Sequence, residues 1–179
     1  MAHIHTNPGD HDPTASAYIV KLDSLEPKLL LHVHKKIGKL LQPGGHIEVN
    51  ENPWKAVLHE IEDETGYTKE QLVLFQLKDR IKTLTGALLH PHDVCVNTHP
   101  FPGLEHQHTD TAYAFGVYEE PLRTPQDGES RQLGWFTLEQ LMALTDEQTF
   151  ASIREIGSYV LTQCVRRWEQ VDITQFAVE

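Results

Sequence analysis

The residues best suited to chemistry are three carboxylates, Glu60, Asp63 and Glu64, spaced three and one positions apart in a segment with helical periodicity. At about 100° per residue they share a helix face, separate from the apolar stripe that contains Trp54 and Ile61. Neighbouring carboxylates repel one another unless a cation lies between them. Mg²⁺ and Mn²⁺ take oxygen ligands and commonly act on phosphates. The spacing therefore predicts a divalent-metal site for phosphate chemistry.

Acidic residues on one helix face are also common without any ion, and the flanking glycines help to decide between the two interpretations. Gly44 and Gly45 precede the helix and let the backbone approach its acidic face closely. This approach would also bring a backbone carbonyl within reach of a cation. The flanking residues therefore favour the metal site.

The segment Gly45–Tyr67, GHIEVNENPWKAVLHEIEDETGY, resembles the Nudix box, G-x5-E-x7-R-E-U-x-E-E-x-G-U with U aliphatic. The positions that match are Gly45, Glu51, Glu60, Ile61, Glu64 and Gly66. The positions that depart are His59 for Arg, Asp63 for Glu and Tyr67 for an aliphatic residue. A later segment, Gly134-Trp135-Phe136-Thr137-Leu138-Glu139-Gln140-Leu141, resembles the family's closing W-F-x-x-x-E-L pattern. The resemblance covers roughly residues 15–145.

The resemblance implies an α/β fold, a Nudix-type α/β/α sandwich with a mixed β-sheet, which a C-terminal helix extends. It implies a pyrophosphohydrolase that uses Mg²⁺ or Mn²⁺. The substrate would be a nucleoside diphosphate linked to another moiety, or a similar organic pyrophosphate, with water attacking at phosphorus. Two alternatives stay open: a catalytically weak nucleotide-binding or regulatory module, and a prenyl diphosphate isomerase, for which Cys95 would be the reactive thiol.

The resemblance also implies roles for individual residues. The metal ligands would be the Gly44 carbonyl, Glu60, Asp63, Glu64 and, from the loop before Trp135, Glu129. Glu60 would also be the general base, with Glu64 beside it. His59 fills the position of an orienting arginine, but it offers a weaker, pH-dependent charge and no bidentate contact. Catalysis could therefore be weakened or tuned to another substrate.

Several of the twelve histidines are candidates for contacts with substrate. His106, His108 and Asp110 alternate at the start of a strand, which would put them on one face bordering the metal cleft. His46 follows Gly45 closely and would lie near the same site. The H-x-H pairs suggest zinc, but no cysteine or glutamate stands at a standard offset, so the pairs alone do not predict a structural zinc site. Loops at 85–108 and 120–130 would shape the substrate pocket.

Both strands and helices are expected to position these residues. Asn52 and Pro53 predict a helix start and Gly66 its end, which gives a helix over 53–65. The expected strands are 15–22 and 28–34, paired as a hairpin, then 46–49, 72–77, 81–84, 93–97, 109–118 and 132–136. Capping boxes at Thr137 and Thr145 open helices over 138–144 and about 149–170.

Composition limits the function classes. The formal net charge of −11 disfavours nucleic acid polymers and anionic membranes as partners, and leaves a small diphosphate substrate. The two cysteines form no disulfide framework, and no secretory signal opens the chain, so we expect a cytoplasmic protein. The length suits one domain, residues 15–179, after a flexible arm of residues 1–14. The oligomeric state is open, and a homodimer is compatible with the sequence.

Overall fold

A computed structural model describes residues 7–101, 103 and 105–178, and its centre is a pair of long parallel strands. β1 (His11–Lys21) and β7 (Gln107–Val117) pair along their whole length, with His11 opposite Gln107 and Lys21 opposite Val117. In a parallel pair in register, partner residues point to the same face of the sheet. The alternation of each strand therefore creates two continuous faces.

The other strands add to this centre in antiparallel orientation. The β1 side carries β2 (Lys28–Val33), β3 (Leu40–Leu41), β4 (Gly44–His46) and β8 (Leu133–Phe136). The β7 side carries β5 (Val73–Gln76), β6 (Cys95–Pro100) and β9 (Glu169–Asp172). The sheet is therefore mixed, as the sequence predicted, and the expected β1–β2 hairpin is present.

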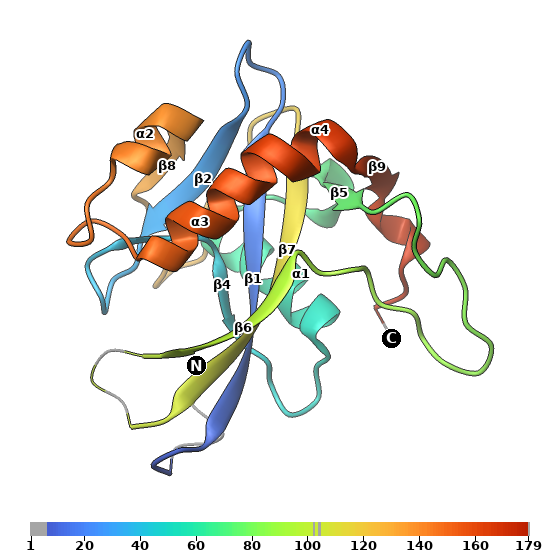
Figure 1. Ribbon diagram of the computed structural model, residues 1–179, viewed down its shortest axis with the longest axis horizontal. Helices are drawn as coiled ribbons and strands as arrows, with labels where there is room; N and C mark the ends of the chain where they lie inside the picture. Colours follow the sequence, from blue (N-terminus) through green and yellow to red (C-terminus); the bar gives the residue numbers. More distant parts are fainter. Residues whose placement is uncertain (1–6, 102, 104, 179) are drawn as a thin grey trace.

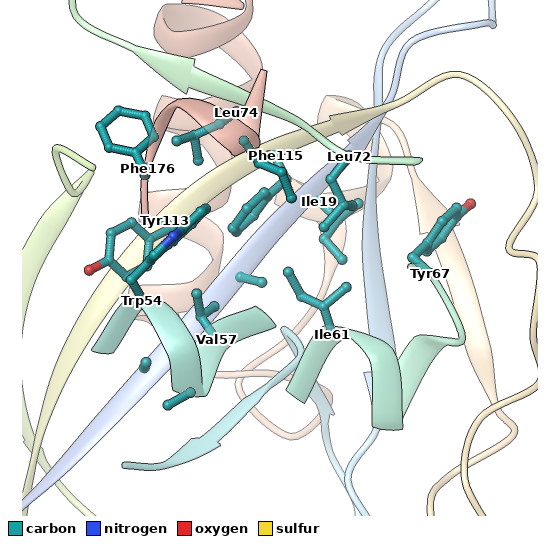
Figure 2. Close-up of a cluster of buried hydrophobic side chains, with 14 of the residues drawn as sticks. Ile19, Trp54, Val57, Ile61, Tyr67, Leu72, Leu74, Tyr113, Phe115 and Phe176 are labelled. Carbon is teal, nitrogen blue, oxygen red and sulfur yellow. The ribbon is translucent and has the colours of Figure 1, made fainter. Parts of the chain in front are cut away.

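Helix α1 (Pro53–Thr65) covers one face of the sheet (Figure 1). Its bounds match the prediction because both end signals are local. The Asn52 side chain accepts a hydrogen bond from the Lys55 N–H, and Gly66 ends the helix at φ 77°. The apolar stripe of α1 is buried, and the Trp54 ring stacks on Phe115 with centroids 5.9 Å apart (Figure 2).

The opposite face is covered by α2 (Leu138–Ala143) and a longer C-terminal helix. That helix runs through α3 (Ala151–Tyr159), a π-helical turn (Val160–Cys164) and α4 (Val165–Arg167), in front of the sheet in Figure 1. Two short 3₁₀ turns, η1 (Lys69–Gln71) and η3 (Ile173–Gln175), complete the elements. The arrangement confirms the predicted α/β/α sandwich with a C-terminal helix.

The structure corrects three expectations about strands. Residues 81–84 form no strand; Ile81 and Leu84 are exposed and have no sheet partner in the described residues. Strand β9, which was not expected, pairs with β5 instead. β1 begins at His11, so residues 11–14 belong to the sheet and not to a flexible arm. Residues 1–6 of the expected arm lie outside the described residues.

Within the described residues, no helix combines the length and the apolar character that crossing a bilayer would require.

Candidate active site

Strand β4 meets the C-terminal half of α1 at Gly44. The Gly44 N–H donates a hydrogen bond of 2.8 Å to Glu64 Oε2. Gly44 has φ 152°, and a Cβ atom there would lie 2.6 Å from the Ala15 carbonyl oxygen on β1. Only glycine fits between β1 and α1 at this position, so the Gly-Gly turn brings backbone onto the acidic helix face as expected. A role for the Gly44 carbonyl as a metal ligand stays a prediction.

Glu60 and Glu64 are buried carboxylates, with 3% and 6% of their surface exposed. Burial, followed by the charges of Asp63, Glu129 and Glu51, raises the pKa of Glu60 to about 8. Burial is also the main reason that the pKa of Glu64 rises to about 9, with Glu60 and Glu129 adding to the rise and the Gly44 N–H opposing it. Both groups therefore need nearby positive charge to ionise fully at neutral pH.

His59, at the position where the box pattern has arginine, lies between two other carboxylates. Its Nε2 is 3.1 Å from Asp63 Oδ2, and its Nδ1 is 3.6 Å from Glu51 Oε1. The His59 side chain is about half exposed. A histidine here can therefore link Asp63 to Glu51, although it cannot make the two parallel contacts of a guanidinium.

The loop before β8 brings a further carboxylate, Glu129, towards the helix. The Gln126 N–H donates to the Asp63 carbonyl, and the Arg123 N–H donates to the Gly66 carbonyl, which docks this loop on the end of α1. The charge of Glu129 contributes to the raised pKa of both Glu60 and Glu64. Glu129 therefore lies near both carboxylates, and its role as a metal ligand stays a prediction.

A cavity of about 910 Å³ opens beside these carboxylates. Glu64 and Glu129 border it, together with Phe101 and His34, whose rings are 6.5 Å apart. Ligand cavities commonly measure about 300–1,000 Å³ and combine apolar walls with a few polar groups. The expected pocket loops contribute residues 97, 99–101, 103, 108 and 128–130, whereas residues 85–96 and 120–127 do not border the cavity.

The polar end of the β1–β7 pair forms part of the cavity wall. Asp110 accepts hydrogen bonds from Thr14 Oγ1 (2.9 Å) and Ser16 Oγ (2.7 Å), which fix its carboxylate against β1. His46 and His108 both border the cavity, with ring centroids 4.9 Å apart. His106 is buried, and its ring centroid is 5.5 Å from that of His108. In the described part of the chain, His106 does not border the cavity.

The charge state of His108 bears on its expected contact with phosphate. Burial, followed by the neighbouring His46, His99 and His106, lowers the pKa of His108 to about 4. At neutral pH His108 is therefore a neutral imidazole and offers no positive charge to an anion. Substrate binding by His46, His106 and His108 stays a prediction.

Comparison with known proteins decides the family. The NUDIX domain family model matches residues 12–155. The chain belongs to the Nudix family. A Nudix-family hydrolase of Clostridium perfringens is 30% identical, with 84% of this chain and 95% of that chain covered and a TM-score of 0.68. No curated protein matched the chain.

More distant Nudix structures support the fold alone. A Caenorhabditis elegans Ap4A hydrolase binary complex is 18% identical over 82% of this chain and 92% of its own, with a TM-score of 0.60. The Nudix domain of Shewanella oneidensis NrtR, complexed with ADP ribose, is 15% identical over 85% of this chain and 89% of its own, with a TM-score of 0.60.

The carboxylates of this Nudix box fit a divalent cation by their chemistry. Glu60 and Glu64 are buried acids whose ionisation is opposed by burial and by nearby carboxylates, and a cation supplies the missing charge. Mg²⁺ keeps several of its waters, so a few carboxylates are enough to hold it. The donor set is therefore suited to the hard cations that Nudix proteins typically use.

One residue near the Nudix box was not selected from the sequence. His32 Nε2 lies 3.7 Å from Glu64 Oε2, and His32 is buried in β2 beside the cavity. Burial, followed by the charge of His34, lowers the pKa of His32 to about 4. The H-x-H pair of strand 28–34 was a visible signal, but its nearness to Glu64 depends on how β2 and α1 pack together.

Proposed function

We propose that this protein hydrolyses a nucleoside diphosphate linked to another moiety, or a similar organic pyrophosphate, with Mg²⁺ or Mn²⁺. The observation that carries the proposal is a pair of buried carboxylates, Glu60 and Glu64, of which Glu64 borders a cavity of about 910 Å³. That volume suits a nucleotide-sized ligand. Two fold neighbours are described with nucleotide compounds, Ap4A and ADP ribose, which agrees with this substrate class.

The metal would be held by Glu60, Asp63, Glu64 and Glu129, with the Gly44 carbonyl as a further oxygen. When bound, it would supply positive charge to the diphosphate. The chain's own residues provide the general base and position the reacting groups. Glu60 accepts a proton from the attacking water, the water oxygen bonds to phosphorus, and the bridging P–O bond breaks with its electron pair leaving on phosphate.

The surrounding residues position these groups. The Gly44 N–H fixes one oxygen of Glu64, and His59 restrains Asp63 and Glu51 through contacts of 3.1 and 3.6 Å. Phe101 and His34 border the cavity with their rings 6.5 Å apart, and a nucleobase would stack on one of them. The substrate would thus lie between an aromatic wall and the carboxylates of α1.

The test is a phosphate-release screen over nucleotide sugars, dinucleoside polyphosphates and nucleotide cofactors, with Mg²⁺ and with Mn²⁺. On the best substrate, E60Q and E64Q should each lower kcat by about 10²–10⁴-fold. The matched control is E62Q, which changes an acid on the same helix turn. The Glu62 side chain is about 40% exposed and pairs with Arg123 at the surface. Near-normal turnover in both E60Q and E64Q would reject the assigned roles.

The same screen separates the alternative functions. Saturable nucleotide binding without cleavage of any compound would indicate a binding or regulatory module. A prenyl diphosphate isomerase lacks support, because burial, followed by Asp110, raises the pKa of Cys95. A thiol with a raised pKa stays protonated and is a poor nucleophile.

A further inference from the structure

Three neighbouring strands bring two histidines and an aspartate together at the polar end of the sheet. Asp12 on β1 lies directly opposite His108 on β7, and Thr14, two residues along β1, lies opposite His46 on β4. All three side chains therefore project from the same face of the sheet. One ligand atom from each lies within 4.8 Å of the others, and in the described part of the chain no other three His, Cys, Asp or Glu residues meet that spacing.

This cluster is distinct from the carboxylates of α1, although His46 belongs to the Nudix-box segment Gly45–Tyr67. Its residues come from three strands, whereas Glu60, Asp63 and Glu64 come from α1. His46 and His108 border the cavity, while Asp12 is fully buried beneath them. An ion held here would therefore have protein on one side and the cavity on the other.

We propose that Asp12, His46 and His108 form a second metal site, which binds Zn²⁺ or a similar transition-metal ion with one coordination position open to the cavity. Two imidazoles and one carboxylate are a common donor set for zinc with an open position, and imidazole nitrogen favours Zn²⁺ over Mg²⁺. The site does not depend on the proposed hydrolysis and takes a different class of ion from the Nudix box.

The distances and charge states suit this ion. Asp12 Oδ2 and His46 Nε2 are 3.3 Å apart. Ligands at about 2.0–2.1 Å from a tetrahedral Zn²⁺ are separated by about 3.4 Å. Because the three ligand atoms already lie within 4.8 Å of one another, small side-chain rotations would bring them to the spacing that a bound ion requires. Metal binding also needs neutral imidazole, and His108 is neutral at physiological pH.

The alternative is a metal-free contact between Asp12 and His46, with the His108 ring packed against it. Titration of the purified protein with Zn²⁺, and with Co²⁺ followed by visible absorption, distinguishes the two. Excess Mg²⁺ is included so that the Nudix box is occupied. We expect one equivalent to bind. Because loss of an outer-shell partner already weakens metal sites by about 10–100-fold, D12N, H46Q and H108Q should each weaken binding by at least about 100-fold.

Matched controls assign the ion to this cluster. H99Q removes a cavity histidine whose ring is 5.7 Å from His108 and should bind like the wild type. E64Q should also retain the site. Melting curves confirm that each variant is folded, and H46Q changes the more exposed of the two ligand histidines. No stoichiometric binding, wild-type affinity in folded H46Q and H108Q, or loss of the ion in E64Q would overturn the proposal.

Discussion

The melting temperature of the metal-free protein should fall as the pH rises, because two buried carboxylates resist ionisation. Burial is the largest cause that raises the pKa of Glu60 from 4.5 to about 8 and that of Glu64 to about 9. In the unfolded chain both groups return to a pKa of about 4.3. Between the unfolded and folded values the folded protein holds more protons, so the free energy of unfolding decreases with rising pH.

The size of the effect follows from the shift of one group. One pKa unit corresponds to about 1.4 kcal/mol, so the rise of Glu60 from 4.5 to about 8 amounts to about 5 kcal/mol across that window. The shift of Glu64 includes the charge of Glu60, so the two contributions do not add. For a domain of this length, about 5 kcal/mol corresponds to a decrease of about 10–20 °C in Tm.

The assay is differential scanning fluorimetry at about pH 5 and about pH 8, with EDTA and then with Mg²⁺. In EDTA, E60Q should show a smaller decrease in Tm than the wild type, because its neutral amide does not ionise while Glu64 still does, and E62Q should keep the whole decrease. Mg²⁺ should raise Tm most at the higher pH, since it binds the ionised carboxylates of the folded state. An equal pH slope in E60Q and wild type, or a slope that Mg²⁺ leaves unchanged, would refute the reasoning.

Two further predictions concern His59 and Gly66. H59A should lower kcat by about tenfold and destabilise the protein by less than about 1 kcal/mol, since the half-exposed His59 contributes mainly by restraining Asp63 and Glu51. H59R should match or exceed the wild-type rate. Unchanged kinetics in H59A would show that His59 does not have this role. G66A should destabilise the protein by at least about 3 kcal/mol in chemical denaturation, because a Cβ there would lie 2.0 Å from the Arg123 carbonyl oxygen. Its control is G86A, which has the same φ of 77° in open space and should lose only about 1–2 kcal/mol; equal losses would show that the contact with Arg123 does not matter.

The parts of the fold that the sequence predicted well are those with local causes. Helix α1 has its cap, its first proline and its terminal glycine within its own segment, so its bounds could be read directly. The acidic residues of α1 share a face because helical spacing alone places them there. The same reasoning placed the β1–β2 hairpin, whose strands are separated by a short turn.

The parts that the sequence did not predict depend on distant partners. The first residues of β1 are polar and contain Pro13, so they resemble a loose arm. They become a strand because β7 lies beside them and Asp110, 96 residues after Thr14, accepts its hydroxyl hydrogen. Strand β9 pairs with β5, which comes almost a hundred residues earlier, whereas residues 81–84 have the composition of a strand but no neighbour in the described sheet.

The register of β1 and β7 has a consequence for substrate selection. On one face of the pair, Tyr18 and Ala114 lie under the C-terminal helix, while Asp12, His108 and Asp110 stand at the other end, where His108 and Asp110 border the cavity and Asp12 is buried. Because the strands are parallel and in register, their polar ends coincide and form one wall. In the proposed function the Nudix box would supply the carboxylates, and this wall, together with Phe101, would face the rest of the substrate. Substitutions on β1 and β7 should therefore change KM and substrate preference more than they change the chemistry performed by α1.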